Sequence, residues 1–200
     1  MLSAFITMQE KNIYIISGCN GAGKTTASMT ILPEILNCKE FVNADMIASG
    51  LSPFQPEKVA FEAGRIMLER INFLIQTNQS FAIETTLATK SYKNKLLKAI
   101  ENGYKVKLLF FWLPTYEMAI NRVAIRVSEG GHNIPKEIIK RRYFRGIENL
   151  FKIYLPLCSS WIVFDNENES KLIAEKNNSG EIIIVDNFKW FLISKLNSDL

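Results

Sequence analysis

The most specific chemical signal stands near the start of the chain, in the sequence GCNGAGKT at residues 18–25. It matches G-x-x-x-x-G-K-[ST], the P-loop, whose backbone N–H groups curl around phosphate oxygens at the N-terminus of a helix. We expect Lys24 to reach the β- and γ-phosphates of ATP and the Thr25 hydroxyl to hold Mg²⁺. The residues expected to bind the nucleotide are Gly18, Asn20, Gly21, Ala22, Gly23, Lys24, Thr25 and Thr26.

Three apolar runs of the sequence end in acidic residues, at Asp45, Glu84 and Asp165. A P-loop is common to kinases, GTPases, motors and switches, so a second acidic site must distinguish them. In P-loop kinases the P-loop strand is commonly central, with the second and third strands to one side; on that analogy Asp45 and Glu84 emerge beside the phosphates. Asp165 would lie on the other side, and we interpret it as a turn residue. For Asp45 a catalytic base, a metal ligand and a helix N-cap remain open.

The elements that must position these residues follow from the hydrophobic pattern. Apolar runs typical of strands occur at 12–17, 40–44, 80–84, 105–113 and 160–165. Helical patterns separate them at 24–36, 56–78, 90–102, 115–128 and 135–153. Near-continuous apolar strands with intervening helices predict an α/β fold, with a central, mostly parallel five-stranded sheet flanked by helices. Two further apolar runs around NNSG predict a C-terminal β-hairpin at one sheet edge, followed by a helix.

Composition limits the remaining classes of protein. The 200 residues, 48% of them hydrophobic, suit a single domain over 1–200. Apolar runs fall short of the roughly 18 residues of a membrane span, and the start MLSAFITMQEKNIYI does not read as a signal peptide, so we expect a cytoplasmic protein without a membrane partner. Three cysteines without CxxC spacing read as reduced thiols. A net charge of +4 suits phosphorylated small molecules better than nucleic acid.

Several motifs together resemble one family. The segments GCNGAGKTT, NADMIASGLSP, AGRIML and AIETTLAT, followed by GGHNIP ahead of an arginine-rich helix, resemble the zeta toxin family of P-loop kinases over about residues 12–165. The resemblance implies a P-loop kinase fold and ATP-dependent phosphorylation of the 3'-hydroxyl of the N-acetylglucosamine in UDP-N-acetylglucosamine. It also implies a toxin held in check by an antitoxin protein that obstructs the ATP site.

The resemblance further implies roles for individual residues. Lys24 and Thr25 correspond to the P-loop lysine and the metal-binding hydroxyl, and Asp45 to the catalytic aspartate. Glu84 corresponds to a substrate-contacting glutamate, and we add Thr85 to the substrate-binding residues.

A mobile lid is expected at about residues 128–146, around GGHNIP. Arg122 and Arg126 are four residues apart, share a helix face and are our first choice for its catalytic cations. His132 is expected to contact substrate or phosphate. The competing lid cations are His132, Arg141, Arg142 and Arg145.

Two alternative functions remain open from the sequence. One is a P-loop kinase of another acceptor: a nucleoside, a cofactor such as NAD, or a nucleic-acid 5' end. The other is a non-catalytic nucleotide-binding module, in which Asp45 and a basic lid would be superfluous. The segment KRRYFR at 140–145 mixes basic and aromatic residues, as nucleic-acid patches do. On a helix, however, Tyr143 and Phe144 can face the core while the cations face the ATP cleft, so we consider nucleic acid the weaker interpretation.

Overall fold

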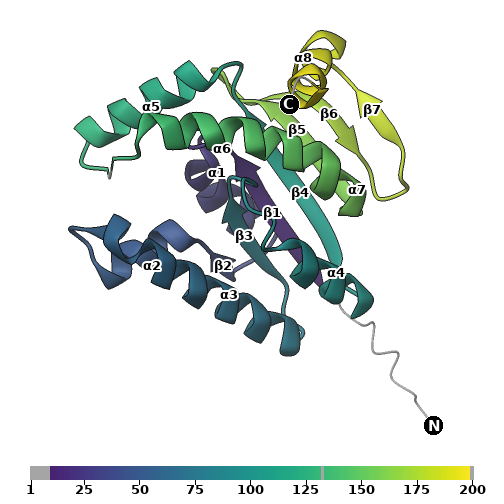
Figure 1. Ribbon diagram of the computed structural model, residues 1–200. Helices are drawn as coiled ribbons and strands as arrows, with labels where there is room; N and C mark the ends of the chain where they lie inside the picture. Colours follow the sequence, from purple (N-terminus) through teal and green to yellow (C-terminus); the bar gives the residue numbers. More distant parts are fainter. Residues whose placement is uncertain (1–9, 132, 199–200) are drawn as a thin grey trace.

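One sheet runs through the computed structural model, which describes residues 10–131 and 133–198; within these residues it has seven strands in the order β2-β3-β1-β4-β5-β6-β7 (Figure 1). The strands are β1 Asn12–Gly18, β2 Phe41–Val42, β3 Phe81–Thr85, β4 Lys105–Trp112, β5 Ser160–Asp165, β6 Lys171–Lys176 and β7 Ile182–Ile184. All neighbouring pairs from β2 to β5 are parallel, and β6 and β7 pair antiparallel. The predicted hairpin therefore continues the sheet beyond β5, which makes seven strands where the sequence analysis counted five and a hairpin.

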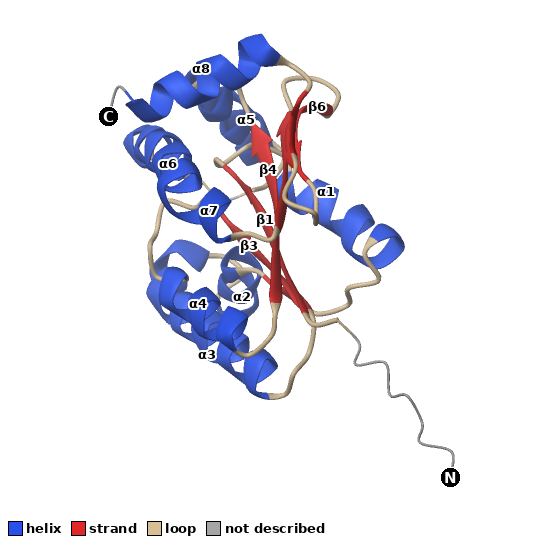
Figure 2. Ribbon diagram, turned by 90° about the vertical axis from the view of Figure 1, so that its right-hand side faces the viewer, coloured by secondary structure: helices blue, strands red, loops and turns tan. Residues whose placement is uncertain are grey.

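The helices lie on both faces of this sheet. Figure 2 shows α1 on one face and α3, α4 and α6 on the opposite face. The chain passes from β1 to the far edge at β2 and then returns across the sheet, so right-handed crossovers place α1 opposite the later helices. The α-helices are α1 Lys24–Thr30, α2 Ala44–Leu51, α3 Ala60–Gln76, α4 Lys93–Glu101, α5 Tyr116–Ser128, α6 Lys136–Asn149, α7 Leu155–Leu157 and α8 Asn187–Ser198.

The core sits on the central strands. Every residue of β1 is buried, and Ile13, Ile15 and Ile16 are fully buried, as a strand covered by helices on both faces requires. Phe81 on β3 and Phe111 on β4 add the largest apolar volumes beside it. The residues that follow the carboxyl ends of these strands are therefore attached to the buried core.

Two predicted helices contain π-helical turns. The helix predicted at 24–36 is α1 followed by a π-helix, Ile31–Ile35, because Pro33 has no N–H to donate. The helix predicted at 135–153 is α6 followed by a π-helix, Leu150–Tyr154, and then by α7. A short 3-10 helix, Pro56–Val59, precedes α3.

The strand predicted at 40–44 is wrong at its end. Only Phe41–Val42 pairs as a strand, and α2, which was not predicted from the sequence, begins at Ala44. Asn43 is the N-cap of α2: its Oδ1 accepts hydrogen bonds from the backbone N of Asp45 at 2.8 Å and of Met46 at 3.2 Å. Asn43 thus satisfies the orphan N–H groups of the first turn, and the alternative that Asp45 is the cap is excluded.

None of the helices within residues 10–131 and 133–198 is long and apolar enough to span a membrane. Cys19, Cys38 and Cys158 are buried free thiols, in agreement with the sequence analysis.

Candidate active site

The P-loop joins β1 to α1 in the geometry that its sequence predicts. Gly21 and Gly23 have φ of 78° and 80°, in the left-handed region where a side chain is strained. A Cβ on Gly18 would lie 2.3 Å from the carbonyl oxygen of Phe111, so the loop can leave β1 only through a glycine. Burial raises the pKa of the Cys19 thiol to about 11, which makes this unusual loop residue an unreactive space-filling side chain.

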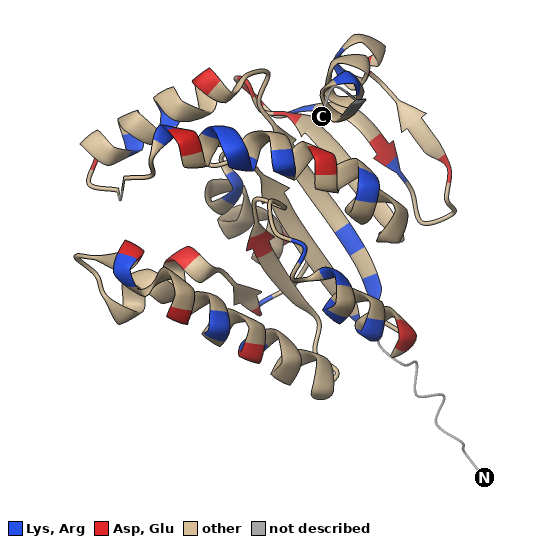
Figure 3. Cartoon of the chain, in the orientation of Figure 1, with Lys and Arg blue, Asp and Glu red and all other residues tan. Residues whose placement is uncertain are grey.

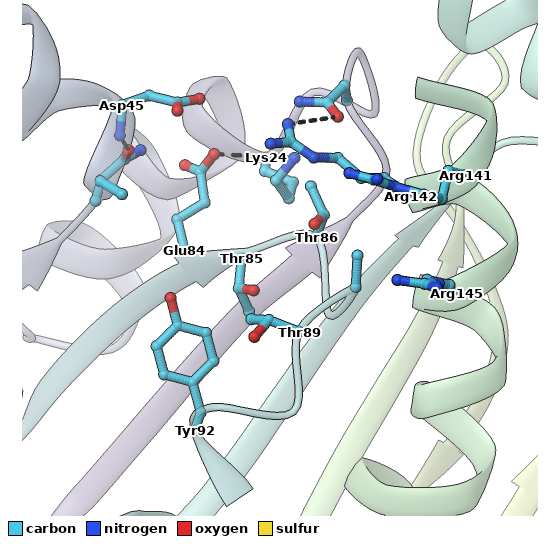
Figure 4. Close-up of a pocket in the computed structure, with 14 residues that line it drawn as sticks. Lys24, Asp45, Glu84, Thr85, Thr86, Thr89, Tyr92, Arg141, Arg142 and Arg145 are labelled. Atoms are coloured by element: carbon cyan, nitrogen blue, oxygen red, sulfur yellow. Dashed lines mark hydrogen bonds and ion pairs between the residues drawn. The ribbon is translucent and has the colours of Figure 1, made fainter. Parts of the chain in front are cut away.

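A cleft of about 320 Å³ opens beside the P-loop at the carboxyl ends of β1 and β3 (Figure 4). Four separate elements supply its functional side chains: the P-loop, α2, β3 with the segment after it, and α6. Its lining includes Asn20, Lys24, Asp45, Glu84, Thr85, Tyr92, Arg141, Arg142 and Arg145. The cleft therefore brings together Lys24, Asp45 and Glu84, as the sequence analysis predicted from the strand order.

Glu84 connects the P-loop to β3. Its two carboxylate oxygens accept hydrogen bonds from the Thr25 hydroxyl at 2.9 and 3.0 Å, and Oε1 lies 3.9 Å from Lys24 Nζ. Burial raises the pKa of Glu84, while Lys24 and the Thr25 hydrogen bond oppose that rise. Lys24 Nζ also donates to the backbone oxygen of Cys19 at 2.9 Å. The lysine side chain therefore lies across the P-loop.

The Thr25–Glu84 pair fits the donor preference of Mg²⁺, because hydroxyl and carboxylate oxygens are hard ligands. Within residues 10–131 and 133–198 no group of three or more His, Cys, Asp and Glu side chains is arranged to hold a metal ion. A magnesium ion at this pair would consequently need further oxygen ligands from phosphate and water, as is usual for Mg²⁺ in nucleotide sites.

Asp45 stands at the second residue of α2, one turn after the end of β2. Because Asn43 caps the helix, the carboxylate of Asp45 is not needed to start it. Figure 4 shows this carboxylate on the same side of the cleft as Glu84, across from the arginines of α6. Its negative charge contributes to the raised pKa of Glu84 and acts against the lowering of the pKa of Arg142.

The segment 140–145 divides its side chains between two surroundings. Tyr143 is buried, and its hydroxyl donates to the backbone oxygen of Leu113 at 2.8 Å, while Phe144 packs on Tyr116. The basic side chains Arg141, Arg142 and Arg145 line the cleft instead, and Figure 3 shows the row of basic residues along α6. Arg142 Nη1 donates to Asn20 Oδ1 in the P-loop at 3.3 Å. The aromatic residues thus anchor α6 while its cations face the P-loop.

Gly146 allows α6 to come this close. A Cβ at Gly146 would lie 2.5 Å from the backbone oxygen of Thr86, in the segment that follows β3. One turn on, Asn149 Nδ2 donates to the backbone oxygen of Leu87 at 2.7 Å, and Leu87 has a left-handed φ of 59°. Neither Gly146 nor Asn149 was expected from the sequence to shape the site. A glycine inside a helical pattern was the one available signal, because it indicates a close backbone approach.

We expect Gly146→Ala to lower both stability and phosphoryl transfer. The added methyl must push α6 away from Thr86, which costs about 1–3 kcal/mol for an overpacked contact. Thermal or urea unfolding measures the first effect and turnover the second. Gly180→Ala is a matched control for stability, because Gly180 lies in the β6–β7 turn with open space around it, and its left-handed φ costs only local strain. Loss of transfer in Gly180→Ala equal to that in Gly146→Ala would contradict this account.

The arginines of α5 lie elsewhere. Arg122 does not line the cleft; its Nη2 donates to the backbone oxygen of Glu167 at 2.6 Å and its Nη1 to that of Gly21 at 3.4 Å. Arg126 packs near Gly131 at the end of α5, and among the described residues its buried Nε and Nη2 atoms have no hydrogen-bond partner. His132 falls outside the described residues. The catalytic roles of Arg122 and Arg126 stay predictions.

The contacts of Asp165 are with the turn after β5 and with α8. Its side chain is buried, its Oδ1 accepts from the backbone N of Glu167 at 3.0 Å, and its Oδ2 accepts from Lys189 Nζ at 2.5 Å. These contacts close the turn after β5, as the interpretation of Asp165 as a turn residue expected.

The strand order, the P-loop after central β1 and the helices on both faces place this fold among the P-loop kinases. The sequence model of the zeta toxin family matches residues 55–178, and the chain belongs to this family. The match begins after the P-loop and Asp45, which are recognised by their own motifs.

The chain is also similar to individual proteins. An uncharacterised protein of Haemophilus influenzae is 32% identical over 136 residues, which are 68% of this chain and 94% of that protein. The AvrRxo1-ORF1:AvrRxo1-ORF2 structure with sulphate ions has a TM-score of 0.75 at 15% identity and covers 94% of this chain. This chain spans only 64% of that relative's length. A structure of the PezAT toxin-antitoxin system of Streptococcus pneumoniae has a TM-score of 0.64 at 18% identity, covering 96% of this chain and 88% of that one.

Proposed function

We propose that this protein transfers the γ-phosphoryl group of ATP to the 3'-hydroxyl of the N-acetylglucosamine in UDP-N-acetylglucosamine. The acceptor is the one that the resemblance to the zeta toxin family implies, and membership of that family supports it. One observation carries the catalytic part of the proposal: a single cleft is lined by the P-loop lysine Lys24, the carboxylates of Asp45 and Glu84, and three arginines of α6. A binding module would need the lysine alone.

The chemistry assigns a task to each group. Phosphoryl transfer requires alignment of the acceptor oxygen, neutralisation of charge on the moving group and removal of the acceptor proton. Asp45 suits proton removal, since its carboxylate lies in the cleft and is not used to cap α2. Lys24 and Arg142 supply positive charge on the P-loop side of the cleft.

Glu84 and Thr25 would hold the metal. Mg²⁺, when bound, supplies charge neutralisation at the β- and γ-phosphates. Glu84 accepts a hydrogen bond from the Thr25 hydroxyl, and burial raises the pKa of Glu84. A cation bound beside it would oppose that rise, because an opposite charge favours the ionised carboxylate. Thr85, whose Oγ1 accepts from the backbone N of Leu87 at 3.1 Å, lies next to Glu84 in the cleft lining and contacts the acceptor.

A lid over residues 128–146 completes the site within one domain that spans 1–200. It contains the end of α5 and the first part of α6, and its closure would exclude water from the cleft that the arginines of α6 already line. Two guanidinium nitrogens of Arg126, Nε and Nη2, are buried and have no hydrogen-bond partner among the described residues, which supports a role in this closure, because a buried donor without an acceptor is costly until an anion reaches it.

The protein would act in the cytoplasm as a toxin and bind an antitoxin protein. Support comes from the zeta toxin family and from the PezAT neighbour, which is described as a toxin-antitoxin system. The use of ATP is supported by the related AvrRxo1-ORF1:-ORF2 complex, which has been solved with ATP.

We expect Arg142→Ala and Arg126→Ala each to reduce turnover by about 10²-fold or more, because one lost donor to transition-state charge typically costs that much. Affinity for Mg-ATP should change far less. Steady-state transfer and calorimetric ATP binding separate the two effects. Arg70→Ala is the matched control, since Arg70 pairs with Glu40 on the protein surface away from the cleft. Wild-type turnover in Arg142→Ala or in Arg126→Ala would remove that arginine from the catalytic machinery.

The acceptor is tested with a panel of compounds. Wild-type protein is incubated with Mg-ATP and, separately, with UDP-sugars, nucleosides, NAD and 5'-hydroxyl oligonucleotides, and each mixture is analysed by mass spectrometry. The proposal predicts a phosphoryl increment on UDP-N-acetylglucosamine above all others. An increment on a different class alone would replace the acceptor while retaining the kinase.

A further inference from the structure

The P-loop is held from outside the cleft by two elements. One is α5, which packs directly against the loop: a Cβ on Gly21 would lie 3.0 Å from the backbone oxygen of Ala119 and 3.1 Å from Arg122 Cβ. The other is the turn after β5, where Asn166 approaches so closely that a Cβ on Gly23 would lie 2.8 Å from its Nδ2. The two glycines with left-handed backbone therefore face two different neighbours.

Arg122 ties these two elements together. Its guanidinium donates to the backbone oxygen of Gly21 in the P-loop and, at 2.6 Å, to that of Glu167 in the turn after β5. A planar guanidinium with several fixed donors can hold two carbonyls at once, and a lysine can hold them less rigidly. Arg122 is thus already engaged by the protein itself.

Asn166 holds the next peptide group of the loop. Its Nδ2 donates to the backbone oxygen of Ala22 at 2.7 Å, and its Oδ1 accepts from the Ser170 hydroxyl. The backbone N of Asn166 donates to the oxygen of Trp112 at 2.9 Å, which fixes the turn to the end of β4. Asn166 is therefore oriented by the turn and directs its amide at the P-loop.

These contacts determine which way the loop's N–H groups point. A peptide group is planar and trans, so a carbonyl fixed on one side directs the following N–H to the other side. Holding Ala22 O outward directs the N–H of Gly23 away from Asn166. The hydrogen bond to Gly21 O fixes the preceding peptide group, whose N–H, on Ala22, donates to the backbone oxygen of Cys19 at 3.2 Å and so closes the loop. Inward N–H groups are what a P-loop uses to bind phosphate.

We propose that Arg122 and Asn166 are positioning residues that hold the P-loop peptide groups in the phosphate-binding conformation without contacting the nucleotide. The inference rests on the proposed function only in taking phosphate as the ligand of the loop. It gives Arg122 a different role from the catalytic one that its spacing from Arg126 suggested.

The test compares two ligands that both carry a triphosphate, of which only one carries a nucleoside. Calorimetry measures the affinity of wild type, Arg122→Ala and Asn166→Ala for Mg-ATP and for inorganic triphosphate. A residue that acts through the loop should weaken both ligands by the same factor, about tenfold for a hydrogen bond to a group of this kind. Asn166→Asp keeps the shape but sets an oxygen against Ala22 O, and it should weaken both ligands at least as much. Arg70→Ala is the control and should leave both affinities unchanged.

A double variant adds a second readout. Because both residues hold one loop, Arg122→Ala with Asn166→Ala should cost less than the product of the single effects. Thermal unfolding checks that each variant is folded at the temperature of the titration.

Two results would overturn the proposal. Weaker ATP binding with unchanged triphosphate binding would place Arg122 or Asn166 against the nucleoside, and unchanged affinity for both ligands with lost transfer would place Arg122 at the reacting phosphate. Failure of the proposed function looks different: wild type would bind both ligands and phosphorylate no acceptor, and the affinity changes would still report on the loop.

Discussion

Asp45→Asn is expected to bind Mg-ATP almost as well as the wild type and to lose about 10²-fold or more in turnover, the loss typical of a missing general base. Asparagine keeps the size of the side chain and removes its ability to accept a proton. The helix is unaffected, because Asn43 caps α2 through its hydrogen bonds to the N–H groups of Asp45 and Met46. The change therefore acts on the chemistry alone.

Calorimetric ATP affinity and the rate of transfer, measured on the same preparation, separate the roles that were open for Asp45. A metal ligand would lose nucleotide affinity and magnesium dependence along with turnover. Glu101→Gln is a matched control, since Glu101 is an exposed acidic residue at the end of α4 that does not line the catalytic cleft. Full transfer by Asp45→Asn would remove Asp45 from the reaction.

Lys24→Ala is expected to damage both binding and turnover. The lysine is buried, donates to Cys19 O at 2.9 Å and lies 3.9 Å from Glu84 Oε1, so it is positioned by the loop and by the neighbouring strand. Loss of a hydrogen bond to a charged phosphate should weaken ATP by roughly 10- to 100-fold, and loss of charge at the transition state should lower turnover by about 10²-fold.

The removal of Lys24 has a second, measurable effect on Glu84. Lys24 opposes the rise in the pKa of Glu84 that burial causes, so Lys24→Ala should raise that pKa further. Titration of Glu84 by NMR in both proteins measures the change. Lys98→Ala, on the surface of α4, is the control and should leave Glu84 and ATP binding as they are. Unchanged ATP affinity in Lys24→Ala would contradict the assignment of the P-loop.

The backbone of the fold was predictable because its signals are local. The strand at 160–165 was predicted with the bounds it has, and the positions of β1, β3 and β4 differ by one residue at most. Apolar runs and the P-loop motif carry this information directly. The start of α2 was missed because Asn43 ends a two-residue strand as well as capping the helix, and the apolar pattern continued across both.

The cleft was predictable only on one side. Glu84 lies at the end of a strand and Lys24 and Asp45 follow strand ends, and the strand order brings these ends together. The basic side depends on how α6 crosses the segment after β3, which is set by the contact of Gly146 with Thr86 O and by the hydrogen bond from Asn149 to Leu87 O. Spacing on a helix cannot report such a contact, so it favoured Arg122 and Arg126 on α5, while Arg141, Arg142 and Arg145 line the cleft.

The central claim is tested most directly by following one reaction to its product. Wild-type protein and Asp45→Asn are incubated with Mg-ATP and UDP-N-acetylglucosamine, and the product is examined by phosphorus NMR, which locates the new phosphate on the sugar. In the wild-type reaction we predict that the loss of ATP equals the amount of product formed. The product is a phosphomonoester whose phosphorus couples to the proton on carbon 3' of the N-acetylglucosamine. With Asp45→Asn we predict almost no product. Consumption of ATP by the wild type with free phosphate as the sole product, or equal product from both proteins, would contradict the account.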